Sequence, residues 1–270
     1  MLIELLASIL FLWISAGLTS SIAYYAFRRA SQPGALVLAF LLSAMSAWSV
    51  LYAVELLVPE LQGKVLAAQL QYLAIAAIPP LWLIFSLQYT GRADWLTPAR
   101  QRWLFIPGII TCLLVFTNQW HGLIWQGVAL DPAGHRELYI IGRGFWFWVH
   151  TTYAYGLIVS GIIRFVWFAV QVPKLYRLQA LFMVGSTLVP LMGNAVYLFG
   201  GLPRSWFDPT PFFFSASGVL LAVGFFRVGL FDVTPIAARM IIANLQDAVI
   251  VLDHLYRVID LNPAARQPMW

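Results

Sequence analysis

Eight side chains that could hold a small molecule lie within or at the ends of strongly apolar segments. They are Tyr52, Glu55, Gln69, Tyr72, Trp146, His150, Tyr153 and Asn194. Their positions along the predicted membrane spans place them at one depth, near the outer surface. Polar groups at membrane depth face the helix bundle or a water-filled cavity. The sequence therefore supports two interpretations: a ligand pocket that opens outward, or hydrogen bonds that hold neighbouring helices together.

Glu55 is the acidic member of this set. A helix that begins at Gly34 and rises about 1.5 Å per residue carries Glu55 about 31 Å away, close to one hydrocarbon thickness. We therefore expect Glu55 at the outer interface. It is either a solvated helix end or an anion at the rim of the pocket, paired with Arg136 or Arg143.

Several sharper chemistries lack the residues that they need. A retinal protein requires a lysine in its last span, whereas Lys64 and Lys174 are both expected in loops. A haem held across the bundle requires several histidines, and His150 is the only one expected inside a span. No Walker loop, zinc-protease motif or nucleophile elbow is present. We expect no catalytic residue, metal or cofactor in this part of the chain.

The composition indicates a polytopic membrane protein, because 61% of the residues are hydrophobic and only 10% are charged. The net charge of +5 is explained by membrane orientation and does not require a nucleic acid partner. Cys112 is the single cysteine, which excludes an intrachain disulfide.

Seven apolar segments are long enough to predict an all-α, seven-transmembrane helix bundle in the lipid bilayer. The predicted spans are 2–25, 34–57, 65–87, 103–116, 145–170, 178–198 and 211–226. Prolines at Pro79-Pro80, Pro107 and Pro190 are expected to interrupt three of them, either as hinges or as the ordinary prolines of membrane helices.

Basic residues alternate between the predicted loops in a way that sets orientation. One side holds Arg28, Arg29, Arg92, Arg100, Arg102, Arg164, Lys174, Arg177, Arg227 and Arg239, and the other holds Lys64, Arg136, Arg143 and Arg204. This predicts an outside N-terminus and a cytosolic C-terminus. The long connection 117–144 would then lie outside, either as a lid on the bilayer containing a hairpin or as a simple connector.

The C-terminal stretch has the pattern of a soluble domain. Thr234-Pro235 is a cap-and-proline helix start, and 248–252 and 257–261 are predicted strands of a hairpin. Asn262-Pro263 repeats the helix-start signal. This order, with Asp247-Ala-Val-Ile-Val-Leu-Asp253 and Arg257-Val-Ile-Asp-Leu-Asn-Pro-Ala-Ala265, resembles the start of an α/β PAS domain. The predicted organisation is a seven-transmembrane domain at 1–227, a linker helix at 228–246, and a truncated PAS start at 247–270.

Three further stretches resemble the N-terminal seven-transmembrane region of bacterial sensor histidine kinases. They are residues 50–91, with Gln71-Tyr72, Pro79-Pro80 and Tyr89-Thr-Gly91; residues 145–156; and the exit Phe231-Asp-Val-Thr-Pro235. The resemblance implies a multi-pass sensor in the bacterial inner membrane that relays a signal through Arg227, Phe231, Asp232, Thr234 and Pro235. It also implies a homodimer, a response regulator as partner, and ATP with Mg²⁺ only in a kinase domain beyond Trp270. A diguanylate cyclase output would serve the same input.

Two rival functions remain at this point. A transporter or membrane enzyme with a cytosolic appendage requires polar residues near the bilayer midplane, and many transporters contain an internal repeat. A structural anchor would only place an output domain at the membrane. A single helix suffices for an anchor, so seven predicted spans favour a sensor.

Overall fold

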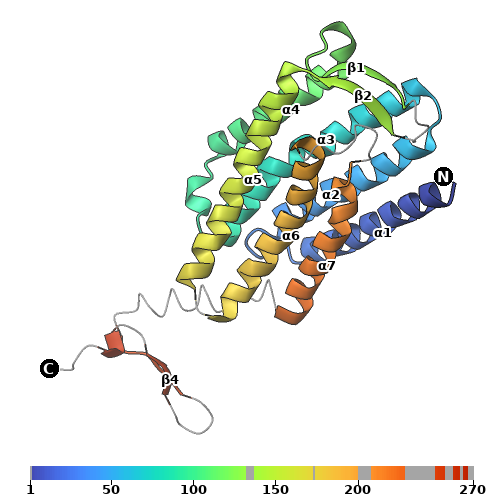
Figure 1. The fold of residues 1–270 in the computed structure, drawn as a ribbon. Helices are drawn as coiled ribbons and strands as arrows, with labels where there is room; N and C mark the ends of the chain where they lie inside the picture. Colours follow the sequence, from blue (N-terminus) through green and yellow to red (C-terminus); the bar gives the residue numbers. More distant parts are fainter. Residues whose placement is uncertain are drawn as a thin grey trace. The chain divides into compact units, whose positions relative to one another are not determined.

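The computed structural model describes residues 2–131, 137–172, 174–199, 208–228, 247–252, 258–261 and 264–266. Within these ranges, seven long helices form most of the chain (Figure 1). They are α1 (Leu2–Phe27), α2 (Ala35–Leu57), α3 (Leu61–Tyr89), α4 (Pro98–Phe116), α5 (Phe145–Gln171), α6 (Lys174–Phe199) and α7 (Thr210–Val228). The chain divides into two compact units, Met1–Val228 and Gly229–Trp270.

The helices follow the apolar segments of the sequence, and each of the seven predicted spans lies on one of them. Six of these helices, α1 to α6, are long and apolar enough to cross a membrane, and the apolar part of α7, Thr210–Gly224, is shorter. Four helices begin before the predicted span: α3, α4 and α6 by four or five residues and α7 by one. The N-terminus of α4 is fixed by Thr97, whose side chain accepts a hydrogen bond from the Arg100 amide at 3.3 Å. Hydropathy finds the lipid-embedded part of such a helix and misses its polar first turn.

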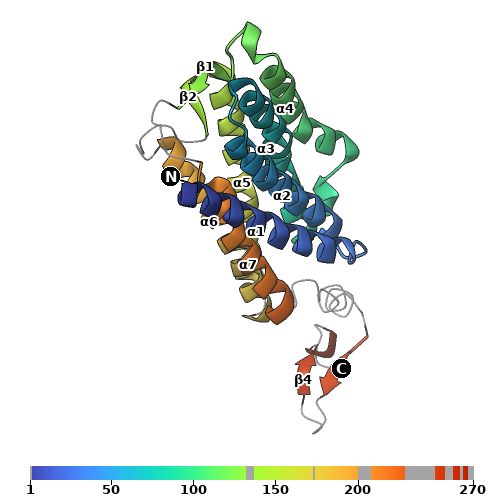
Figure 2. The same cartoon turned by 90° about the vertical axis from the view of Figure 1, so that its right-hand side faces the viewer.

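The first unit is a ring of helices. In chain order α1, α2 and α3 pack side by side, α3 packs on α5, and α5, α6 and α7 follow until α7 returns to α1 (Figures 1 and 2). Helix α4 packs against α3 and α5. The predicted prolines do not interrupt the helices: α3, α4 and α6 continue through Pro79, Pro80, Pro107 and Pro190.

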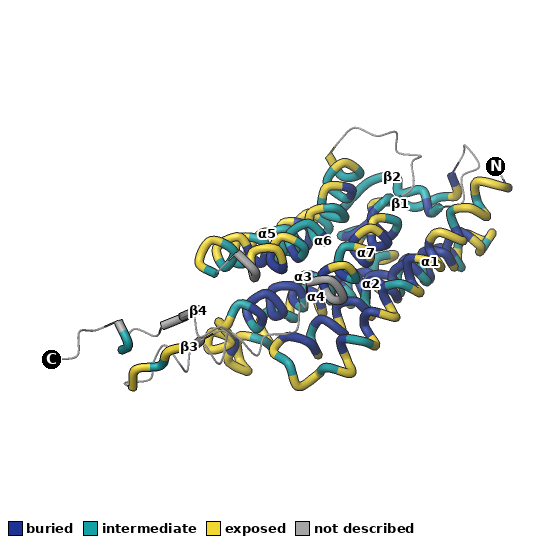
Figure 3. Tube along the Cα trace, turned by 90° about the horizontal axis from the view of Figure 1, so that it is seen from below, coloured by how far each residue is buried: buried dark blue, intermediate teal, exposed yellow. Residues whose placement is uncertain are grey.

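Burial separates the inner and outer faces of this ring. Buried residues gather on the faces that helices turn toward one another, and exposed residues follow the outer faces (Figure 3). Many exposed residues are large and apolar, including Leu113, Ile163 and Met192. An apolar outer face is what a lipid environment requires of a membrane bundle.

An aromatic cluster joins α3 to α5. Phe85 and Phe165 are fully buried, with ring centroids 5.8 Å apart, and Trp82 lies 5.4 Å from Phe165. The Trp82 indole donates a hydrogen bond of 3.0 Å to the Ile158 carbonyl. Gly161 makes this approach possible, because a Cβ atom there would lie 2.2 Å from the indole nitrogen.

The connection between α4 and α5 contains the predicted hairpin. Its strands, β1 (Trp125–Leu130) and β2 (Leu138–Arg143), pair antiparallel with Leu130 opposite Leu138. Asn118 fixes the approach to β1, since its side-chain oxygen accepts hydrogen bonds from the Ile124 and Trp125 amides at 2.9 and 3.1 Å. Ile124, Trp125 and Leu138 are buried in one apolar cluster with residues of α3 and α4. The hairpin is thus packed onto the bundle.

In the second unit, the described residues contain the other predicted hairpin. Strands β3 (Ile250–Leu252) and β4 (Val258–Leu261) pair antiparallel, with Ile250 opposite Leu261, and the short 3-10 helix Ala264–Arg266 follows. The Asn262-Pro263 helix start lies outside the described residues. The same holds for most of the predicted linker helix, including Phe231, Asp232, Thr234 and Pro235, while Arg227 belongs to the last turn of α7.

Candidate ligand-binding cavity

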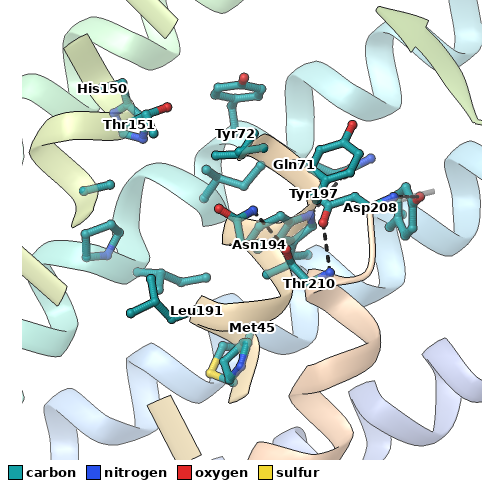
Figure 4. Close-up of a pocket in the computed structure, with 18 of the residues that line it drawn as sticks. Met45, Gln71, Tyr72, His150, Thr151, Leu191, Asn194, Tyr197, Asp208 and Thr210 are labelled. Atoms are coloured by element: carbon teal, nitrogen blue, oxygen red, sulfur yellow. Dashed lines mark hydrogen bonds between the residues drawn. The ribbon is translucent and has the colours of Figure 1, made fainter. Parts of the chain in front are cut away.

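A cavity of about 800 Å³ lies inside the ring of helices. Its wall is formed by α2, α3, α5, α6 and α7, and residues of the β1–β2 hairpin, including Trp125, Leu138 and Arg143, complete it. This volume is within the range of roughly 300–1,000 Å³ that is usual for small-molecule sites. The wall is mainly apolar and carries a few convergent polar groups (Figure 4).

Glu55 is the centre of a buried network that joins two helices to the hairpin. One carboxyl oxygen accepts a hydrogen bond of 2.6 Å from the Gln71 side chain of α3, and the other accepts one of 2.8 Å from the Leu138 amide of β2. The Trp48 indole donates to the Gln71 side-chain oxygen at 3.2 Å. Glu55 is only 4% exposed. The interpretation of Glu55 as a solvated helix end is therefore wrong.

Lys64 also differs from its predicted position in a loop. It lies in the first turns of α3, is buried, and donates a hydrogen bond of 2.7 Å to the Glu55 carbonyl at the end of α2. Because α3 begins at Leu61, the α2–α3 connection is short and Lys64 reaches back across it. Its cationic end satisfies a helix C-terminal carbonyl, which is a favourable position for positive charge.

A second network connects α2, α5, α6 and the start of α7. The Tyr155 hydroxyl donates to the Asn194 side-chain oxygen at 2.8 Å, and the Asn194 amide donates to the Thr210 hydroxyl at 2.9 Å. The Thr210 amide donates to Asp208 at 2.9 Å, and the Asp208 amide donates to the Tyr52 hydroxyl at 3.0 Å. Figure 4 shows Asn194, Asp208 and Thr210 together on one side of the cavity. The first residue of α7 is thus tied to the cavity wall.

His150 lies on the other side of the cavity with Thr151 (Figure 4). Its Nδ1 is 3.1 Å from the Thr111 hydroxyl of α4. The Trp146 indole donates to the same hydroxyl at 2.9 Å. The His150 Nε2 atom is buried and has no hydrogen-bond partner among the described residues.

The structure divides the eight predicted residues into two groups. Five line the cavity: Tyr52, Glu55, Tyr72, His150 and Asn194. The other three, Gln69, Trp146 and Tyr153, do not belong to its lining and instead hydrogen-bond to α4, reaching the Val115 carbonyl, the Thr111 hydroxyl and the Leu104 carbonyl respectively. The three residues outside the lining make bonds of the kind that the helix-joining interpretation expects, and ligand contact by the other five stays a prediction.

Many polar residues of the cavity wall were not in the predicted set, among them Arg143, Tyr197 and Asp208. Asp208 was detectable as an acidic residue directly before an apolar helix. Arg143 was considered only as a partner of Glu55, whose carboxyl oxygens instead accept hydrogen bonds from Gln71 and Leu138. Among the described residues no group of three or more acidic, histidine or cysteine side chains could hold a metal ion. The wall offers hydrogen bonds, one guanidinium and apolar surface.

The chain matches the model of a known protein family. The family described as the N-terminal 7TM region of histidine kinase matches residues 11–235, which include most of α1, all of α2 to α7 and the whole cavity wall. No curated protein matches the chain.

Proposed function

The chain belongs to the family of N-terminal 7TM regions of histidine kinases, and on that premise we propose that the cavity binds the signal and that α7 carries the response toward the cytosol. The family implies a multi-pass membrane sensor, the input region of a histidine kinase. The observation that supports the proposal is the position of α7. Asp208 and Thr210 at its start and Phe214, Ser217 and Leu221 along it contribute to the cavity wall.

The contacts of α7 make it suited to respond to an occupied cavity. Its N-terminal end is bound to the wall through Asn194 and Tyr52, and the Ser15 hydroxyl of α1 donates to the Pro211 carbonyl at 3.1 Å. A molecule that fills the cavity therefore contacts α7, the helix from which the chain leaves the bundle. A ligand shifts an equilibrium between two helix arrangements only if it binds them with different affinity. A ligand that contacts α7 differently in the two arrangements binds them with different affinity.

The topology in this proposal has seven spans, an outside N-terminus and a cytosolic C-terminus in a bacterial inner membrane. The distribution of basic residues supports it. Lys64, which sequence analysis counted on the outer side, is buried against the Glu55 carbonyl and does not weaken the bias. The response would then pass through the linker and a PAS domain to a dimeric kinase output, with ATP, Mg²⁺ and a response regulator acting there.

Filling the cavity tests this proposal. Leu191 of α6 lines the cavity, whereas its neighbour Met192 is 64% exposed on the outer face. We expect Leu191→Trp to act as a permanent occupant and to change autophosphorylation of the full-length protein in nanodiscs at least about fivefold. Met192→Trp adds the same side chain outside the cavity and should leave the rate unchanged. Leu191→Phe is a smaller occupant if the tryptophan variant fails to fold.

A folded Leu191→Trp protein with wild-type autophosphorylation would contradict the proposal. A second experiment addresses the anchor alternative: residues 1–228 are replaced by one unrelated membrane helix. Unchanged regulation in that chimera would favour an anchor, and constant output would favour a sensor.

A further inference from the structure

The cavity has a polar end and an apolar end. Arg143, Tyr197 and Asp208 lie at the end where the hairpin and the start of α7 meet. The other end is lined by residues from the opposite parts of the helices: Leu41, Met45, Ile78, Trp82, Met183 and Leu221. At about 1.5 Å per residue, the lining residue Leu38 lies about 26 Å from Glu55 along α2. The cavity therefore extends far into the bundle.

The apolar end offers few free polar groups. Ser186 and Thr187 line it, but their hydroxyls donate to the Met183 carbonyl at 2.9 and 3.0 Å. The Ser217 hydroxyl donates to the Ser186 carbonyl. Because these hydroxyls already donate to helix carbonyls, they do not require a polar group on a bound ligand. This part of the cavity suits a hydrocarbon tail.

At the polar end, Arg143 is the cationic group of the cavity wall, and its side chain interacts with the Tyr197 hydroxyl. Its guanidinium lies 5.0 Å from the Phe147 ring centroid and 5.2 Å from that of Tyr197. A guanidinium has five N–H donors and prefers carboxylate or phosphate partners. Arg143 is therefore placed to receive an anionic head group.

The carboxyl groups of the wall do not compete strongly for this role. Both Glu55 oxygens accept hydrogen bonds from within the protein, and Glu137 makes contacts of its own. Burial raises the pKa of the Asp208 carboxyl above its ordinary value, against the opposing effects of Thr210 and Arg143. Asp208 thus keeps its proton to a higher pH than an exposed aspartate does, and it repels an anion less.

The hydrogen bonds of Thr111 determine what His150 presents to the cavity. The Thr111 hydroxyl has one proton, which it donates to the Pro107 carbonyl at 2.7 Å. It must therefore accept from both the Trp146 indole and His150 Nδ1. The neutral imidazole carries its proton on Nδ1, so its buried, unpartnered Nε2 is an acceptor. A buried acceptor without a partner is costly, and a hydrogen-bond donor on the ligand would satisfy it.

From these observations we infer that the cavity binds an anionic amphiphile, with its head group on Arg143, a hydrogen-bond donor at His150 Nε2 and its acyl tail at the apolar end. The inference rests on the proposed function and specifies the ligand class of the same site. Arg143 ends β2 and His150 lies in the second turn of α5, five residues after the first helical residue, so the donor lies about 7.5 Å along α5 from the end at which the head group binds. The ligand class is thus a hydroxylated or amide-containing acyl chain with a carboxylate or phosphate at one end.

A photoreactive hexadecanoate tests the charge and the tail. The full-length protein is placed in phosphatidylcholine nanodiscs and labelled with hexadecanoate that carries a terminal diazirine. We expect saturable labelling at residues such as Met45, Met183 and Leu221. Hexadecanoate and hexadecyl phosphate should compete, and hexadecylammonium should not. Competition by phosphatidylglycerol in the disc would assign the anionic amphiphile to the bilayer, and its failure to compete would assign it to the medium.

Arginine variants provide the matched control. Arg143→Gln should raise the Kd of the probe at least about tenfold, and Arg143→Lys should restore part of the affinity. Arg100 also lies over an aromatic ring, that of Trp95 at 5.0 Å, but it is exposed and outside the cavity wall. Arg100→Gln should leave the Kd unchanged.

Hydroxyhexadecanoates test the role of His150. In a series with the hydroxyl at successive carbons, at least one member should bind about tenfold more tightly than hexadecanoate, as one satisfied buried acceptor allows. His150→Phe should abolish that advantage while changing the Kd of hexadecanoate itself by less than about threefold. Labelling that does not saturate, or a preference for hexadecylammonium, would overturn the inference. If Leu191→Trp still changed autophosphorylation in that case, the proposed function would stand without this ligand class.

Discussion

Replacing Glu55 by leucine should destabilise the bundle and release the hairpin. The substitution leaves the Gln71 side-chain amide and the Leu138 amide without their acceptor, at positions where both residues are buried. An unsatisfied buried polar group costs about 1–3 kcal/mol, and a hydrogen bond between membrane helices contributes about 1 kcal/mol. We therefore expect Glu55→Leu to lower the free energy of unfolding by about 3 kcal/mol. Glu55→Gln should cost about half as much, since it keeps one acceptor oxygen.

The assay is equilibrium unfolding in mixed micelles, combined with hydrogen exchange of the hairpin amides. The Leu138 amide should exchange faster in Glu55→Leu, because this bond joins β2 to α2. Glu60→Gln is the control, as Glu60 is exposed and its side chain caps no helix amide. In the double variant Glu55→Leu/Gln71→Leu, only the Leu138 amide and the Trp48 indole lose partners, so the two costs should be less than additive. Additive costs, or a Glu55→Leu protein as stable as wild type, would refute this reasoning.

Two further perturbations follow from the packing and from the buried carboxyl. Gly161→Ala should destabilise the protein by about 1–3 kcal/mol in thermal unfolding, because its Cβ would lie 2.2 Å from the Trp82 indole nitrogen at the α3–α5 contact. Gly156→Ala is the control. A Cβ there would have no atom within 4 Å, so this variant should be neutral or slightly stabilising. Equal effects of the two variants would contradict the packing described. Burial raises the pKa of Asp208, so the folded state binds the carboxyl proton more tightly than the unfolded state does. This proton binding stabilises the fold at low pH. The stabilisation is lost as the pH rises through the pKa of the folded state. Asp208→Asn keeps an acceptor for the Thr210 amide, so its melting temperature relative to wild type should increase between about pH 4 and pH 8; a difference that is constant with pH would exclude this linkage.

The sequence predicted the positions of the helices well because lipid imposes a simple requirement. Each apolar segment must satisfy its backbone hydrogen bonds internally, and all seven predicted spans lie on helices. Helix starts were less predictable. Leu61 and Pro98 precede the apolar residues by one or more turns, and their position depends on capping and on contacts such as that of Lys64 with Glu55.

The cavity lining was only partly predictable, because the depth of a residue in the membrane does not determine the direction in which its side chain points. Gln69 and Tyr72 lie within one turn of each other at nearly the same depth, yet the Gln69 side chain bonds to α4 and Tyr72 lines the cavity. Which side of a helix faces the cavity depends on which helices are its neighbours in the bundle. A single amino-acid sequence does not reveal those neighbours. Arg143 and Asp208 were missed because they belong to connections that only the fold brings over the cavity.

The most direct test of the account is whether filling the cavity moves α7. Val223 of α7 and Phe40 of α2 are both exposed, at 38% and 56%, and each can be replaced by a spin-labelled cysteine in a Cys112→Ser background. Pulsed electron paramagnetic resonance on the full-length protein in nanodiscs then gives the distance distribution between the two helices. We predict a shift on the order of 1–2 Å or a change of populations in Leu191→Trp, and no change in Met192→Trp. Identical distributions in wild type and both variants would contradict the claim that the cavity is coupled to α7.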